Sequence, residues 1–298
     1  MIRENRLSDR LVTAALYLTA LAMSLLCLIP FLHVVSVSLS SRTAVMQMQV
    51  NIWPVGLNFD NYRFLTREAQ VVQSTVISVG RVLIGVSLNL LITILTAYPL
   101  SRDSIRLPGR NLFKVLLLFG MLFHGGLIPT FLSMRYLGLY DNLAVLVLPP
   151  AMNVFFIILM MNFFRAIPIE MTEAATIDGA SHFDILTRIY LPVSLPSLAT
   201  VALFSAVFHW NSWFDGLLYL RKVIYWPLQT YAYARVVQRQ LESRASGGTE
   251  LNPLFLQQLS PEGLVAAFIV LVALPIMLVY PFLQRYFLQG LTLGAVKG

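Results

Sequence analysis

The chain carries the stretch LAVLVLPPAMNVFFIILMMNFF (Leu143–Phe164), followed directly by RAIPIEMTEAATIDGASHFDILTRIYLPVS (Arg165–Ser194). The first stretch is apolar over about the length that a helix needs to cross the hydrocarbon layer of a membrane. The second stretch is polar and charged. Because backbone groups in lipid must pair within the protein, the first stretch predicts a membrane-spanning helix and the second a segment outside the hydrocarbon.

Further apolar runs flank this pair of stretches on both sides. They cover about Leu11–Val35, Val71–Leu100, Leu112–Met134 (interrupted by Gly125-Gly126), Leu195–Leu220 and Gly263–Leu283. The composition agrees, since 57% of the 298 residues are hydrophobic, 12% are charged and the mean hydropathy is +0.73. The runs are continuous rather than alternating, which favours helices over barrel strands. The sequence therefore predicts an all-α, polytopic membrane protein with six transmembrane helices.

The spans divide the chain into three predicted regions. Residues 1–70 hold the N-terminal tail, the first span and an outer loop. Residues 71–284 form a core that includes the polar segment 165–194, and residues 285–298 form a C-terminal tail. The short loop after the second span is basic, and Lys and Arg are enriched in short cytoplasmic loops. We therefore expect both termini to be cytoplasmic and the protein to contact membrane lipid. The same basic loops account for the net charge of +7 without a nucleic-acid partner.

The polar segment predicts two short helices joined by a sharp turn. Pro168 suits the first turn of the first helix. Gly179 suits the left-handed position that ends this helix, and Ser181 with Asp184 resembles a capping box for the second helix. Because residues before a proline avoid the helical region, the second helix is expected to end before Pro192.

At these residues the sequence resembles the EAA motif of binding-protein-dependent ABC importers. The motif has Glu-Ala-Ala, three residues, Gly, nine residues, Ile, one residue and Leu-Pro. The chain keeps this spacing without departure and places it between the fourth and fifth spans. The ending from Gly290 to Gly298 is similar to that of MalG-type sugar permeases. The stretch Trp210–Asp215, with Pro227-Leu-Gln229, resembles the oligo- and polysaccharide branch, which includes alginate importer permeases.

The resemblance implies a type I ABC importer permease fold and a permease subunit of an ATP-driven importer in the bacterial cytoplasmic (inner) membrane. The polar segment would be a coupling helix that docks on a cytoplasmic ATPase. The residues that this role implies are Glu173, Ala174, Ala175, Asp178, Gly179, Ile189, Leu191 and Pro192. The implied partners are a second permease subunit, an ABC ATPase dimer, an extracytoplasmic solute-binding protein and a saccharide, including an acidic one such as alginate.

The chain itself is expected to be non-catalytic. It has no Gly-x-x-x-x-Gly-Lys-Ser/Thr loop, so ATP and Mg would be used by the partner ATPase subunits and no cofactor is expected on this chain. The four histidines lack metal-ligand spacing, and Cys27 is the only cysteine, so no metal site is predicted.

Polar and aromatic groups in the spans are candidates for a substrate pathway, because polar groups within a membrane are costly and face the interior or a water-filled path. The competing interpretation is that aromatic and acidic groups near a span end are interface anchors. The candidates are Asn153, His209, Asn211, Trp213 and Asp215.

The long polar stretch from Arg221 to Pro261 has two interpretations. It is either an amphipathic helix on the outer surface or a contact for a binding protein through Tyr231, Arg235 and Arg239. The main functional alternative for the whole chain is a secondary active transporter of a polar solute. Such proteins show inverted repeats with broken helices, and only the break at Gly125-Gly126 resembles that feature.

Overall fold

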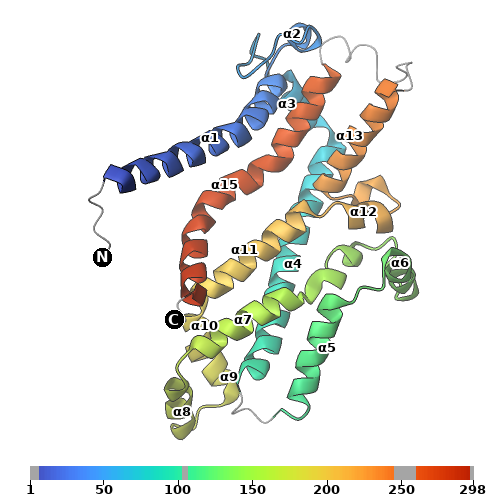
Figure 1. The fold of residues 1–298 in the computed structure, drawn as a ribbon. Coiled ribbons are helices and arrows are strands. Elements are labelled where there is room, and N and C mark those ends of the chain that lie inside the picture. The colour runs from blue at the N-terminus through green and yellow to red at the C-terminus, as the bar shows by residue number, and fades with distance from the viewer. Residues whose placement is uncertain (1–6, 103–106, 245–259, 296–298) are drawn as a thin grey trace. The chain divides into compact units, whose positions relative to one another are not determined.

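The computed structural model describes residues 7–102, 107–244 and 260–295, with side-chain environments over 11–102, 107–238 and 260–279. The described residues form helices and connecting turns and contain no strand, which confirms the all-α prediction (Figure 1). The chain forms two compact units. Unit 1 holds residues 1–69 and 234–274, and unit 2 holds residues 70–233 and 275–298.

Unit 1 contains α1 (Leu7–Ser38), α2 (Arg42–Met46), α3 (Asp60–Arg67), most of α13 (Leu228–Arg244) and the first part of α15 (Pro261–Ala295). The start of α15 lies close to α3 and to the end of α1. Gly263 makes this approach possible, because a Cβ there would collide with the side chains of Ser260 and Asn61. The Asn61 amide donates to the Ser38 carbonyl oxygen at 3.0 Å.

Unit 2 is built around α4 (Ala69–Ser101). Its other helices are α5 (Arg110–Leu122), α6 (Leu127–Tyr136), α7 (Val154–Ala166), α8 (Ile169–Ile177), α9 (His182–Ile185), α10 (Leu191–Val193), α11 (Leu195–Asn211) and α12 (Phe214–Tyr219). Short 3-10 turns span Leu143–Leu146, Pro149–Ala151 and Val223–Tyr225, and a π turn spans Leu186–Tyr190. Helix α7 packs against α5 on one side and α11 on the other (Figure 1).

Within the described ranges, three helices are long and apolar enough to cross a membrane, over Leu11–Ser38, Ala69–Ser101 and Pro261–Val279. Three bent pairs bring the number to six if each pair is one span. They are Arg110–Leu122 with Leu127–Tyr136 (117°), Leu143–Ala151 with Val154–Ala166 (42°), and His182–Val193 with Leu195–Asn211 (80°). The first bend falls at the predicted Gly125-Gly126 break, where Gly126 has a φ of 86° that favours glycine.

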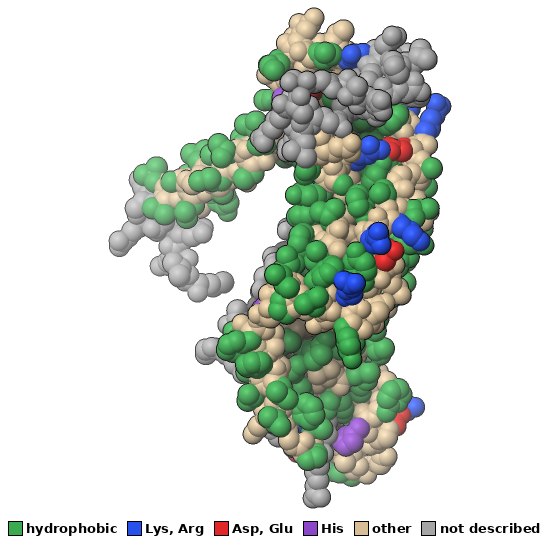
Figure 2. Space-filling view, turned by 90° about the vertical axis from the view of Figure 1, so that its right-hand side faces the viewer, with side chains coloured by type: hydrophobic (Ala, Val, Ile, Leu, Met, Phe, Trp, Pro, Cys, Tyr) green, Lys and Arg blue, Asp and Glu red, His purple; other side chains and the backbone are tan. Residues whose placement is uncertain are grey.

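Many large apolar side chains are exposed along these helices. Figure 2 shows hydrophobic side chains spread over the face that it presents, with few acidic or basic ones among them. In a water-soluble protein such a surface would aggregate, whereas in lipid it is the solvated surface.

The predicted fifth span is shorter than expected. We predicted a single run over Leu195–Leu220, but α11 ends at Asn211 and a separate α12 begins at Phe214. The break has a physical cause, because the Ser212 carbonyl oxygen accepts a hydrogen bond from Arg81 at 3.1 Å instead of continuing the helix.

Candidate functional site

The polar segment folds as a helical hairpin. Pro168 is the N-cap of α8, and the helix ends in a Schellman motif around Gly179, whose φ is 79°. The Ala180 N–H donates to the Ala175 carbonyl oxygen at 2.9 Å, and the Gly179 N–H donates to that of Thr176 at 3.1 Å. These bonds satisfy carbonyls that the helix end would otherwise leave unpaired. The left-handed glycine predicted from the sequence is confirmed.

The second arm begins at the predicted cap. The Ser181 hydroxyl accepts from the Asp184 N–H at 3.2 Å and donates to the Asp184 carboxylate. That hydroxyl, together with Arg188 at 3.4 Å, holds the pKa of the exposed Asp184 carboxyl below its usual range. The expected helix end before Pro192 is wrong, since helical backbone continues through α9, the π turn and α10 to Val193. The wide π turn over Leu186–Tyr190 comes directly before the proline, and such turns relax the regular hydrogen-bond ladder that a proline interrupts.

Tyr190 ties this hairpin to the core of unit 2. Its side chain is fully buried, and its hydroxyl lies 2.9 Å from the Thr172 hydroxyl on α8. Its ring makes edge-to-face contacts with Tyr98 at the end of α4 and Phe164 at the end of α7, with centroids 5.0 and 5.5 Å apart. Tyr190 therefore connects α8 to two spans through one side chain.

Arg102 lies at the same junction, between Tyr190 and the end of α7. Its guanidinium lies 5.1 Å from the centre of the Tyr190 ring. It donates to the Phe164 and Ile167 carbonyl oxygens at 2.8 and 2.6 Å, where α7 ends. A cation is favoured there by the helix dipole, and the ring adds a cation–π contact. Sequence reasoning did not assign Arg102, Thr172 or Tyr190 to the site, and only the basic character of the loop carried a signal for Arg102.

The predicted coupling residues fall into two groups by burial. Half-buried Ala175, Ile189 and Leu191 pack against the core cluster that contains Tyr190. The other group is exposed and consists of Glu173, Ala174, Asp178, Gly179 and Pro192. Ile177 is 86% exposed beside them. The hairpin thus presents small, acidic and apolar groups outward while its inner face is fixed.

A buried ion pair lies on α4, away from the end of the helix that carries Tyr98. Arg81 on α4 donates to both carboxylate oxygens of Asp215 at the start of α12, and its side chain is 1% exposed. The same guanidinium holds the Ser212 carbonyl oxygen. Asp215, a pathway candidate, is therefore a partner of Arg81 that positions the α11–α12 break.

Asn89 forms a second polar junction between spans. Its amide N donates to the Pro150 and Ala151 carbonyl oxygens, both at 2.8 Å. Its amide oxygen lies 2.8 Å from the Ser205 hydroxyl and 2.8 Å from the His209 Nε2. His209 fits against α4 because a Cβ at Gly85 would collide with its ring. The structure thus places His209 in helix packing, where it is 1% exposed.

The other pathway candidates have different environments. Asn153 caps α7, with its side-chain oxygen accepting from the Phe155 N–H at 3.0 Å. Asn211 is exposed at the end of α11, and half-buried Trp213 stacks on Tyr233. The structure does not gather these candidates into one polar cavity.

The candidates for a binding-protein contact, all on α13, also differ in environment. Tyr231 is buried, whereas Arg235 forms an ion pair with Glu68 at 2.9 Å within unit 1. Arg239 lies in α13, and its side chain is outside the described residues.

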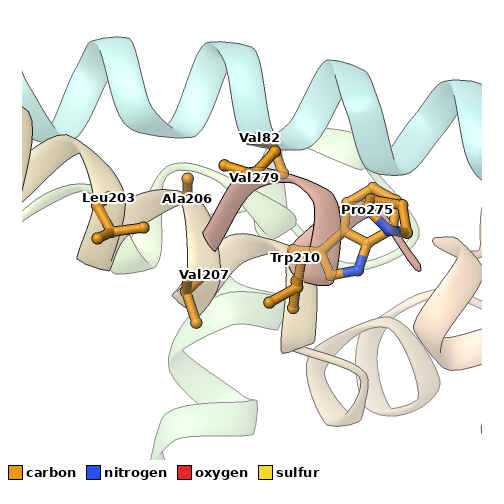
Figure 3. Close-up of a pocket in the computed structure, with 8 residues that line it drawn as sticks. Val82, Leu203, Ala206, Val207, Trp210, Pro275 and Val279 are labelled. Carbon is orange, nitrogen blue, oxygen red and sulfur yellow. The ribbon is translucent and has the colours of Figure 1, made fainter. Parts of the chain in front are cut away.

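A cavity of about 110 Å³ lies beside α4 and α11 in unit 2 (Figure 3). It is lined by Val82, Leu203, Ala206, Val207, Trp210, Pro275, Ile276 and Val279. Saccharide sites combine apolar surface with several convergent hydrogen-bonding groups. This lining is apolar apart from the indole N–H of Trp210, so the cavity does not have the composition of a sugar site. Among the residues that the structure describes, no three His, Cys, Asp or Glu side chains could together hold a metal ion.

Comparison with known proteins identifies the family of this chain. Residues 78–293 match the family described as "Binding-protein-dependent transport system inner membrane component". The chain belongs to this family. It is a transporter permease subunit of a bacterial inner membrane, and this membership replaces the alternative of a secondary active transporter.

Individual relatives agree with the family assignment. The permease is 37% identical to the "Polygalacturonan/rhamnogalacturonan transport system permease protein YtcP" of Bacillus subtilis (strain 168), over 99% of this chain and 100% of the relative. It is 38% identical to "Protein LplC" of the same organism, over 91% and 90%. Among solved structures, a chain of a bacterial ABC transporter involved in the import of the acidic polysaccharide alginate matches with a TM-score of 0.86 and 33% identity, covering 96% of this permease and 99% of that chain.

Proposed function

We propose that this permease couples ATP hydrolysis by partner subunits to the import of an acidic oligo- or polysaccharide. The observation that carries the coupling role is the hairpin of α8 and α9. It presents an exposed outer face and is fixed to α4 and α7 by Tyr190, Thr172 and Arg102. A segment that receives force needs both an accessible surface and a stiff connection to the spans.

The partner at this surface is an ABC ATPase dimer that binds ATP and Mg. Ala174 offers close approach for a helix in a cleft, Glu173 offers a charge for a basic group, and Ile177 offers apolar area at the centre of a contact. Closure of the dimer moves α8, and Tyr190 carries the movement to the ends of α4 and α7. In this proposal the hairpin and both termini lie on the cytoplasmic side.

The substrate class rests on similarity to named relatives. The relative from Bacillus subtilis and the solved alginate transporter are both named for acidic polysaccharides. A second permease subunit supplies the rest of the pathway.

An extracytoplasmic solute-binding protein delivers the saccharide. The α13 region supports this contact through Arg235, whose side chain stays 44% exposed while it pairs with Glu68. Arg239 follows one helical turn later and extends the same basic character along the sequence.

Uptake by the reconstituted complex tests the substrate class. We expect ATP-dependent uptake of tetragalacturonate into proteoliposomes to exceed that of neutral maltotetraose by at least about tenfold, because the importer discriminates by the difference between its affinities for the two sugars. The complex is purified with its native partners, and a non-hydrolysable ATP analogue serves as the control. Uptake driven by an ion gradient without ATP, or an equal rate for both sugars, would contradict the proposal.

A further inference from the structure

Trp213 and Tyr233 form a parallel aromatic stack in unit 2. Their ring centroids are 3.8 Å apart and their planes differ by 23°. Tyr233 is 40% exposed, whereas Trp213 beneath it is half-buried. Phe214 packs edge-on against Trp213, with centroids 5.6 Å apart. The stack is thus a flat apolar surface with one accessible ring.

The backbone beneath this stack is held from two sides. Arg81 binds the Ser212 carbonyl oxygen at 3.1 Å, and the Thr230 hydroxyl donates to the Trp213 carbonyl oxygen at 2.8 Å. Gly216 allows Thr230 to approach, because a Cβ there would collide with the Thr230 hydroxyl. An aromatic residue that only anchors a helix at the membrane surface needs none of these contacts. Such pre-organisation is typical of binding surfaces, where it lowers the cost of ordering.

The position of the stack in the fold also suits a contact with substrate. Helix α11 begins next to the coupling hairpin and ends at Asn211, so Trp213 is at the opposite end of that span (Figure 1). Exposed Asn211 and half-buried Gln229 place amide groups near it in the sequence. Flat rings beside a few polar groups are the composition of small-molecule sites.

We propose that Trp213 and Tyr233 are a stacking platform for a sugar ring at the outer mouth of the pathway, a site that rests on the saccharide-import function proposed above. The apolar C–H face of the sugar lies on the Tyr233 ring, and the amides bind its hydroxyls. Because Arg81 is engaged by Asp215, the platform recognises the ring rather than its charge.

Fluorine NMR of the complete transporter in nanodiscs tests this platform. The complex is labelled with 5-fluorotryptophan, and the Trp213 resonance is assigned by its loss in Trp213→Phe. Tetragalacturonate should shift this resonance, whereas a polyacrylate tetramer, which has charge but no ring, should not. Trp226 is an internal control, since its indole N–H is held by the Leu220 carbonyl oxygen at 3.0 Å.

Transport by matched variants completes the test. Tyr233→Ala should abolish the sugar-induced shift and lower tetragalacturonate uptake about tenfold in a complex that retains all its subunits. Tyr233→Phe should restore both, and Trp53→Ala, at an 81% exposed tryptophan in unit 1, should change neither. Wild-type uptake without a shift of Trp213 would overturn the platform alone. Absence of both uptake and shift would overturn the platform and the proposed function together.

Discussion

Gly179→Val is expected to lower ATP hydrolysis stimulated by the binding protein at least about tenfold, while the protein still assembles in the membrane. Gly179 has a φ of 79°, and a β-branched residue in this region costs about 1–2 kcal/mol. Apart from its two chain neighbours, no residue comes within 4 Å of an added Cβ, so the effect is strain in the turn rather than a clash. The strain reorients α8, and the outer face no longer meets the ATPase. The measurement is ATPase activity of the reconstituted complex.

A matched control separates loss of coupling from loss of fold. Gly138 has a φ of 73° and also has no atom within 4 Å of an added Cβ, but it lies after α6, outside the hairpin. Gly138→Val should introduce similar strain and leave stimulated hydrolysis within about twofold of wild type. Equal loss in the two variants, or full activity in Gly179→Val, would contradict the coupling role.

Arg81→Met is expected to destabilise the permease by about 3–5 kcal/mol, because it leaves the Asp215 carboxylate without its buried partner. The guanidinium also holds the Ser212 carbonyl oxygen, so the α11–α12 break loses its fixed geometry. The measurement is thermal unfolding of the detergent-solubilised protein, followed by size-exclusion chromatography. Arg135→Met, at an exposed arginine at the end of α6, should have little effect.

The double variant Arg81→Met/Asp215→Leu distinguishes a lost ion pair from a lost side chain. Replacing both charges by apolar groups of similar volume is often close to neutral, so we expect most of the stability to return. If the double variant were as unstable as Arg81→Met alone, the unpaired carboxylate would not be the cause of the destabilisation.

The sequence predicted features that depend on local chemistry. The left-handed Gly179 and the Ser181 cap follow from residues within a few positions of each other, and the structure confirms them. Among the described residues, three of the apolar runs form single long helices and the other three contain bent helix pairs. The predicted helix end before Pro192 was wrong, because a π turn allows the helical backbone to continue past this proline. Such a turn has no clear signal in the sequence.

Long-range pairing could not be predicted in this way. Arg81 pairs with Asp215, which is 134 residues away along the chain. The same holds for Tyr190, whose burial depends on Tyr98 and Arg102 arriving from another span. Hydrophobic runs identify which segments are helices, but they do not tell which polar side chains meet between them.

Photo-crosslinking from α8 tests the central claim most directly. A benzoylphenylalanine in place of Ile177, which is 86% exposed, is irradiated in native membranes, and the captured chain is identified by mass spectrometry. The same probe in place of Tyr136, which is 91% exposed at the end of α6, serves as the control. The account predicts that position 177 captures an ATPase with a phosphate-binding loop and that position 136 does not. Capture of no ATPase at position 177, in membranes where the importer is active, would contradict the account.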